Sequence, residues 1–185
     1  MSDFGIFEGT FEPADKIIRC GTRRLVDEKK AGKEKLKVAL GKLQLAVTQG
    51  QFGDPVNGTT AYAVCLYDAA NALRGEYVVE RATDMCGDKP CWKAVSDKGY
   101  AYKDKDAAAD GITQVKLTGG DAGKGQIKIQ GKNSSGNLPT GVAAGLANNP
   151  SSATVQVLSS NLACFSIGLT DIKKAESTVF QAVGP

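Results

Sequence analysis

Two closely spaced cysteines of this chain could form a covalent bond with each other. Cys86 and Cys91 flank the sequence GDKP, which predicts a tight turn that brings the two side chains together. A zinc site would need four ligands at matched spacing, and the other cysteines are scattered along the chain. The sequence therefore predicts a Cys86–Cys91 disulfide, while the pairing of Cys20, Cys65 and Cys164 stays open.

One tryptophan and two tyrosines could stack on a ligand. Trp92 is the only tryptophan of the chain, and Tyr100 and Tyr102 alternate along a predicted strand, so their rings share one face. Such rings either pack against neighbouring strands or form a platform that stacks on sugar rings. We expect packing that anchors a hairpin, and we keep a sugar-binding platform of Trp92, Tyr100 and Tyr102 as the alternative.

Three aspartates followed by glycine form the one candidate for a metal site. Asp104, Asp106 and Asp110 lie in the sequence YKDKDAAADGI, and alternating carboxylates before a glycine can wrap a calcium ion. The spacing differs from the EF-hand pattern, and Lys103 and Lys105 interrupt it. We therefore expect a solvated turn here, with no bound metal.

The complete absence of histidine restricts the possible reactions. It excludes Ser-His and Cys-His nucleophile schemes, histidine acid–base catalysis and most catalytic zinc sites. A hydrolase that uses two carboxylates is the enzyme class that remains. Its candidate residues are Glu76, Glu80, Asp84, Asp104 and Asp110. We expect a non-catalytic protein and keep a carboxylate-dependent glycan hydrolase as the enzymatic alternative.

The composition is that of one ordinary globular domain. The chain has 185 residues, of which 42% are hydrophobic and 23% charged, with a formal net charge of +3. So small a charge does not indicate a nucleic-acid partner, and no apolar run approaches the length of a membrane span. We expect a single domain over residues 1–185, with no nucleic acid, membrane span or cofactor.

The N-terminal sequence MSDFGIFEGTF lacks the basic and apolar regions of a signal peptide. The five cysteines nevertheless favour an extracellular or cell-surface location. We expect residues 1–15 to form an extended strand or arm. Its FGIFEGTF segment could add as a strand to the sheet edge of a neighbouring copy, which predicts self-association.

Short alternating segments between glycine-rich turns predict an all-β protein. Strands are expected around residues 61–69, 76–80, 112–117, 125–131, 153–158 and 163–169. Residues 27–40 contain good helix formers, yet Leu36, Val38 and Leu40 alternate with polar or small residues, so a strand with a bulge at Gly41-Lys42 is expected. Residues 142–146 could form one helical turn. The predicted fold is an antiparallel β-sandwich or barrel-like sandwich with at most one or two short helical turns.

Lysine and arginine are concentrated in residues 16–42. We interpret this segment as a solvated hairpin with its lysines on the outer face. The functional alternative is a basic surface for an acidic polymer. No aromatic residues are interleaved with the lysines to stack on nucleic-acid bases.

A recognisable pattern runs from about residue 53 to the C-terminus in six short segments: residues 92–93, 98–104, 110–112, 122–127, 154–156 and 164–165. In these segments the chain resembles an uncharacterised β-rich domain found in predicted secreted proteins of environmental bacteria. The resemblance implies an extracellular β-rich module and no particular activity. We therefore expect a secreted or cell-surface module with a structural, adhesive or self-assembly role, whose partner is another copy or an extracellular polysaccharide. A carbohydrate-binding module is the alternative.

Overall fold

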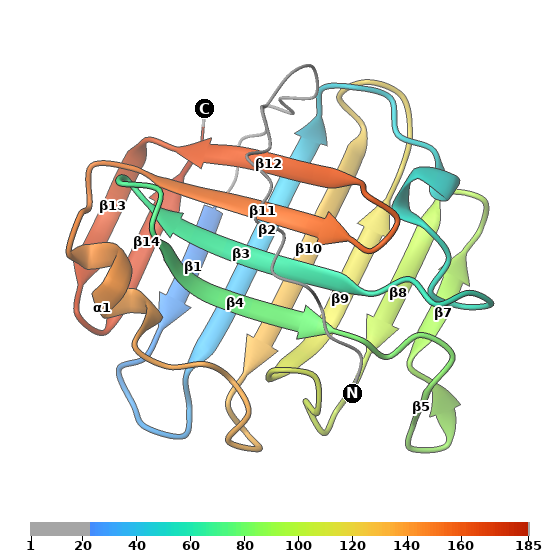
Figure 1. The fold of residues 1–185 in the computed structure, drawn as a ribbon, viewed down its shortest axis with the longest axis horizontal. Coiled ribbons are helices and arrows are strands. Elements are labelled where there is room, and N and C mark those ends of the chain that lie inside the picture. Colours follow the sequence, from blue (N-terminus) through green and yellow to red (C-terminus); the bar gives the residue numbers. More distant parts are fainter. Residues whose placement is uncertain (1–22, 185) are drawn as a thin grey trace.

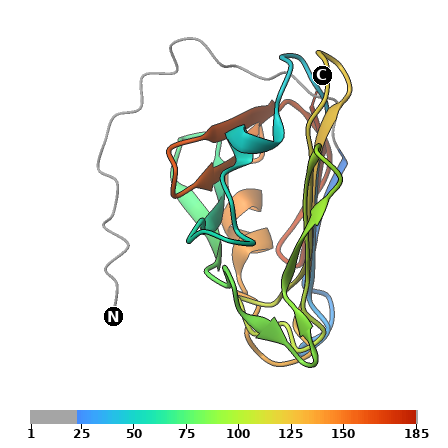
Figure 2. The ribbon, with the colours of Figure 1, turned by 90° about the vertical axis from the view of Figure 1, so that its right-hand side faces the viewer.

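Two antiparallel β-sheets lie face to face in this computed structural model, which describes residues 23–184 (Figure 1 and Figure 2). The larger sheet has eight strands in the order β13 (Asp171–Glu176), β14 (Val179–Val183), β1 (Arg23–Asp27), β2 (Lys35–Leu43), β10 (Gly125–Lys132), β9 (Ile112–Thr118), β8 (Gly99–Lys103) and β7 (Trp92–Val95). The smaller sheet has the order β12 (Cys164–Leu169), β11 (Ala153–Ser159), β3 (Tyr62–Asp68) and β4 (Leu73–Val79). The predicted all-β sandwich is confirmed.

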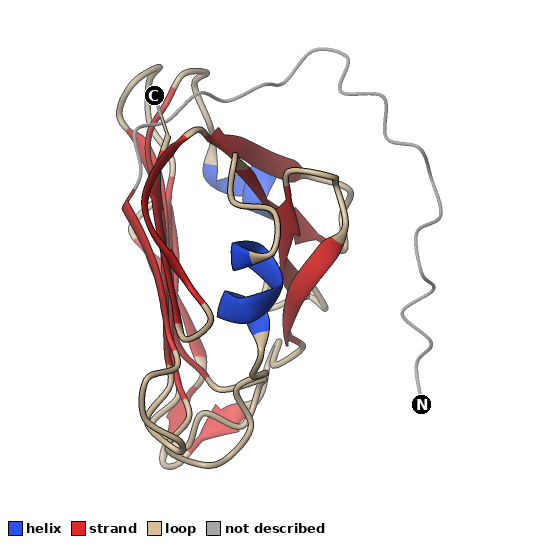
Figure 3. Cartoon of the chain, turned by 90° about the vertical axis from the view of Figure 1, so that its left-hand side faces the viewer, coloured by secondary structure: helices blue, strands red, loops and turns tan. Residues whose placement is uncertain are grey.

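The strands of the smaller sheet cross those of the larger sheet steeply, and two short helices lie at the ends of the sandwich (Figure 1). Helix α1 (Val142–Ala147) lies between the sheets near β13 and β14, as Figure 3 shows. The 3-10 helix η1 (Gln49–Phe52) precedes β3. Both side-chain oxygens of Glu28 accept hydrogen bonds from backbone N–H groups at the start of α1, from Val142 at 3.1 Å and Ala143 at 3.4 Å. The helix thereby closes one end of the core.

Alternation along β2 separates the core from the outer surface. Leu36, Val38 and Leu40 are buried, whereas Lys35 and Lys37 are exposed and Ala39 is half-buried. The pairing of β2 with β10 shifts between Leu40 and Leu43, where Lys42 has a φ of 55°. The expected strand with a bulge at Gly41-Lys42 is therefore confirmed, because burial of one apolar face outweighs the helix propensity of the segment.

Strands β13 and β14 of the larger sheet were not expected from the sequence, whereas β1 and β2 form an antiparallel hairpin, as expected for residues 16–42. β1 pairs with both β14 and β2, so the last strands of the chain lie beside the first described one. β13 has the sequence DIKKAE, which shows no clean alternation. The predicted N-terminal arm (residues 1–15) and its self-association segment lie outside the described residues.

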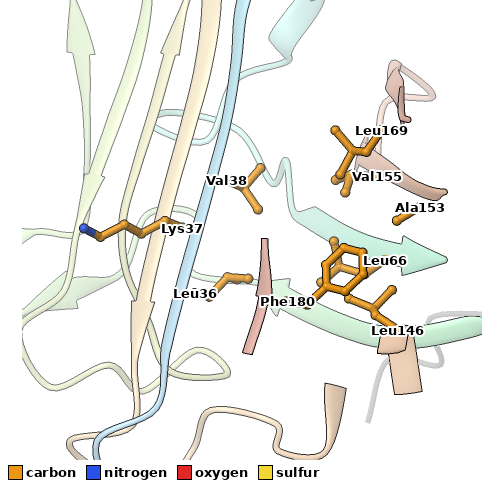
Figure 4. Close-up of a pocket in the computed structure, with 9 residues that line it drawn as sticks. All are labelled: Leu36, Lys37, Val38, Leu66, Leu146, Ala153, Val155, Leu169 and Phe180. Carbon is orange, nitrogen blue, oxygen red and sulfur yellow. The ribbon is translucent and has the colours of Figure 1, made fainter. Parts of the chain in front are cut away.

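A small apolar cavity remains between the sheets beside α1 (Figure 4). Side chains from β2, β3, β11, β12, β14 and α1 line it, among them Leu36, Leu66, Leu146 and Phe180. Lys37 also borders the cavity, but its side chain points away from the other labelled residues. The cavity offers no polar group to orient a ligand, so we treat it as a gap in the packing.

The predicted disulfide between Cys86 and Cys91 is confirmed, and it closes the small hairpin of β5 (Met85–Cys86) and β6 (Lys89–Pro90). The Cys91 backbone ties this hairpin to its surroundings, because its N–H donates to the Asp84 carbonyl and its carbonyl accepts from the Lys103 N–H, both at 2.9 Å. Cys91 is buried directly before Trp92. The disulfide therefore anchors the start of the edge strand β7.

Removal of this disulfide is expected to destabilise the protein by about 2 kcal/mol, the value for closure of so short a loop. The matched pair is the wild type and a Cys86→Ala/Cys91→Ala variant, unfolded in denaturant with and without a reductant. The reductant should lower the midpoint of the wild type and leave the variant unchanged. Equal midpoints for oxidised and reduced wild type would show that the disulfide contributes nothing to stability.

Candidate functional site

Seven exposed lysines occupy the outer side of five adjacent strands of the larger sheet, on the side that faces away from the smaller sheet. We call this surface the lysine face. The strands are β2, β10, β9, β8 and β7. The lysines come from distant parts of the chain: Lys35, Lys37, Lys93, Lys103, Lys116, Lys128 and Lys132.

In each of these strands, successive side chains face opposite sides of the sheet, one side buried and the other exposed. Ile127 and Ile129 of β10 are buried, whereas Lys128 between them is exposed. On β9, Val115 and Leu117 are buried on either side of exposed Lys116. The apolar positions hold the sandwich together, and the lysines are therefore fixed on its outer surface.

The strand register places lysines directly opposite one another in two pairs. Lys128 of β10 is opposite Lys116 of β9, and Lys132 of β10 is opposite Lys35 of β2. Like charges directly opposite on neighbouring strands destabilise a sheet, by about 0.2 to 1 kcal/mol for each pair. The Lys128–Lys116 pair, in which Lys128 has Ala39 on its other side, therefore lowers the stability of the unliganded protein, whereas Lys35 also lies opposite Asp27 of β1.

A mixed row of lysines and glutamines crosses four strands next to the Lys128–Lys116 pair. Gln130 of β10 lies opposite Lys37 on one side and opposite Gln114 on the other. Gln114 in turn lies opposite Lys103 of β8. The row Lys37–Gln130–Gln114–Lys103 spans three strand spacings, or about 14 Å.

No carboxylate neutralises this surface from within the five strands, whose described sequences contain neither Asp nor Glu. Among the ion pairs between residues 28–184, none involves a lysine of the lysine face. The positive charges are thus available to an external anion. A sheet surface that presents ammonium groups and amides can bind an extended anionic polymer through many weak contacts.

Glu34 adjoins the lysine face but is turned inward, where it positions the Lys35–Lys132 pair. Its Oε2 accepts a 2.7 Å hydrogen bond from Nδ2 of Asn133, and its carbonyl accepts from the Asn133 N–H at 3.0 Å. The Asn133 hydrogen bond lowers the pKa of the Glu34 carboxyl. This link joins the start of β2 to the end of β10, so it helps to fix the register of the two lysines.

The three aromatic residues lie inside the sandwich. Trp92, Tyr100 and Tyr102 are 2%, 7% and 1% exposed, and the Trp92 ring lies 5.0 Å from that of Tyr62 and 5.1 Å from that of Tyr102. The three rings are thus buried in the core of the sandwich, and the sugar-binding alternative stays a prediction. Their shared inward direction agrees with the expected packing role.

Two of the three calcium candidates, Asp104 and Asp110, use their carboxylates in internal hydrogen bonds, and the third, Asp106, is exposed. Asp104 is 2% exposed and accepts from the Tyr102 hydroxyl at 3.2 Å and from the backbone N–H groups of Asp106 and Ala108. Asp110 accepts from the Val78 N–H at 2.8 Å. In the described part of the chain, no group of three acidic or cysteine residues could hold a metal ion. Asp104, Asp106 and Asp110, which lie close together in the sequence, therefore do not form a metal-binding group in the structure.

Of the carboxylates considered for hydrolysis, Asp84 and Asp104 share Arg81 as a partner, and Glu76 and Asp110 have other surroundings. Glu76 is exposed on β4, and Asp110 is used by the backbone of Val78. Asp84 and Asp104 come together through Arg81, whose Nε lies 2.7 Å from Asp84 and whose Nη1 lies 3.7 Å from Asp104. This is an ion-pair cluster that joins the segment after β4 to the end of β8.

Two of the cysteines left open by the sequence carry free thiols. Cys65 of β3 is buried and Cys164 of β12 is half-buried. Burial raises the pKa of the Cys65 thiol to about 11 and also raises that of Cys164. Both are therefore protonated, weakly reactive thiols near neutral pH. Cys20 lies outside the described residues.

Sequence reasoning located only part of the lysine face. It placed Lys35 and Lys37 on an outer face but did not connect them with the five lysines that follow residue 92. The local sequences KAV, VKL and IKIQGK already contain the alternation, and only the strand order brings them together.

No helix among the described residues has the length and apolar character of a membrane span. Searches of family models, curated proteins and solved structures yield no match to this chain.

Proposed function

We propose that this protein is a non-catalytic secreted or cell-surface module that adheres to an anionic extracellular polymer through the lysine face. The observation that carries the proposal is the two pairs of directly opposed lysines, Lys128–Lys116 and Lys132–Lys35, on five strands that contain no carboxylate. The nearest carboxylate in the strand register is Asp27 of the neighbouring strand β1, which lies opposite Lys35. An arrangement that costs stability in isolation becomes favourable when an anion neutralises it.

One further observation supports an extracellular role. The Cys86–Cys91 disulfide is typical of proteins that fold in an oxidising compartment. An adhesive function needs no catalytic groups, which is compatible with the complete absence of histidine.

The test compares binding to polygalacturonate, an acidic polysaccharide, with binding to dextran, a neutral one. Immobilised protein at low ionic strength should bind polygalacturonate at micromolar or lower concentration of polymer and show no response to dextran. Equal binding to both polymers would show that charge does not direct recognition. Absence of binding to polygalacturonate would overturn the proposed function.

A further inference from the structure

The row Lys37–Gln130–Gln114–Lys103 combines two kinds of recognition on one line across the sheet. The lysines at its ends supply positive charge, and the two glutamines at its centre supply amide donors and acceptors. A polymer that carries charge alone would use only the lysines. A polymer that also carries hydroxyl groups would use all four side chains.

We infer that the ligand of the lysine face is an acidic polysaccharide whose chain crosses the strands along this row, with Gln130 and Gln114 hydrogen-bonding its hydroxyl and carboxylate groups. This inference rests on the proposed function and names the class of polymer. One pyranose unit of a polysaccharide has a length comparable to the spacing of adjacent strands. Successive sugar units therefore meet successive side chains of the row.

The composition of the lysine face favours a polysaccharide over a nucleic acid. Base stacking needs exposed aromatic rings, and the aromatic residues of β7 and β8 are all buried on the other side of the sheet. Phosphate recognition commonly uses the planar fork of arginine, and β2, β10, β9, β8 and β7 contain no arginine. Lysine and glutamine on a flat surface fit uronate carboxylates and sugar hydroxyls.

The position of the two glutamines makes them suitable for mutation. Both are exposed, lie opposite each other and form no hydrogen bond through their side chains to another described residue. Their replacement by alanine leaves the buried face of β9 and β10 unchanged. Gln126, on β10 opposite Thr118, lies outside the row and provides a matched control.

The experiment measures the affinity of the wild type, the Gln114→Ala/Gln130→Ala variant and the Gln126→Ala control for three polymers. Polygalacturonate carries carboxylates and hydroxyls, polyacrylate carries carboxylates alone, and duplex DNA carries phosphates. The double variant should lose about fivefold to tenfold in affinity for polygalacturonate, the equivalent of one net hydrogen bond, and should bind polyacrylate like the wild type. The Gln126→Ala control should match the wild type on all three.

Each remaining outcome contradicts the inference in a distinguishable way. If the Gln114→Ala/Gln130→Ala variant lost affinity equally for polygalacturonate and polyacrylate, or lost none for either, the glutamines would not recognise sugar groups. The proposed function would still hold in that case, provided that the wild type binds both polyanions. Tighter wild-type binding to duplex DNA than to polygalacturonate would assign the surface to nucleic acid. Failure of the wild type to bind any polyanion would remove the proposed function itself.

Discussion

A Lys128→Glu variant is expected to be more stable than the wild type and to bind an anionic polymer more weakly. In the wild type, Lys128 lies directly opposite Lys116, with Ala39 on its other side. The substitution replaces a repulsive pair with an attractive one, which should add about 0.5 to 1 kcal/mol to the free energy of unfolding. Reversal of one charge should lower the affinity for polygalacturonate about tenfold at low salt.

A Lys124→Glu variant is the matched control for this prediction. Lys124 lies in the turn between β9 and β10, where its Nζ is 3.3 Å from Asp121, so the same change of charge breaks an ion pair away from the lysine face. Its stability should fall slightly and its affinity should stay near that of the wild type. Thermal unfolding and titration calorimetry measure the two quantities. Equal losses of affinity in both variants would show that net charge, and not the lysine face, governs binding.

A Trp92→Ala variant is expected to lose about 3 to 5 kcal/mol of stability. The Trp92 side chain is 2% exposed and contacts the rings of Tyr62 and Tyr102, which belong to opposite sheets. Its removal would leave a cavity at the contact between the sheets, next to the disulfide-anchored end of β7. A loss of this size is a large fraction of the stability of an ordinary domain.

Two further variants separate packing from ligand binding at this position. Trp92→Phe keeps an aromatic ring and should be destabilised less than Trp92→Ala, whereas Lys93→Ala, at an exposed neighbour, should unfold like the wild type. Unfolding is followed by far-UV circular dichroism, since the chain has no other tryptophan to report by fluorescence. A Trp92→Ala variant with wild-type stability that had lost affinity for a neutral sugar would instead support the sugar-binding role of the aromatic residues.

The sequence predicted strands best where burial on one side produced a clean alternation. Strands β2, β9 and β10 are examples, since apolar residues at every second position leave only one orientation in the sandwich. The charged strand β13 was missed because Lys173 and Lys174 are consecutive and no apolar stripe marks the buried side. Pairing of β1 with β14 joins the two ends of the described chain, and local patterns contain no information about such distant contacts.

In the candidate site too, local alternation predicted which side chains share a face, but not which strands lie next to each other. The alternation of Tyr100 and Tyr102 showed that the two rings share a face, but only the position of the smaller sheet shows that this face is buried. The lysine face depends on register: Lys116 and Lys128 are twelve positions apart in the sequence and meet because the turn after β9 aligns them. A shift by one residue would have placed isoleucine on the surface.

The salt dependence of binding to polygalacturonate tests the role of the lysine face most directly. If several lysines contact the polymer together, binding releases several condensed counterions, and the affinity should fall steeply between about 50 mM and about 500 mM NaCl. A Lys116→Gln/Lys128→Gln variant should show a shallower dependence, because it has two fewer contacts. An affinity that is insensitive to salt, or the same salt dependence in the wild type and the variant, would contradict binding through the lysine face.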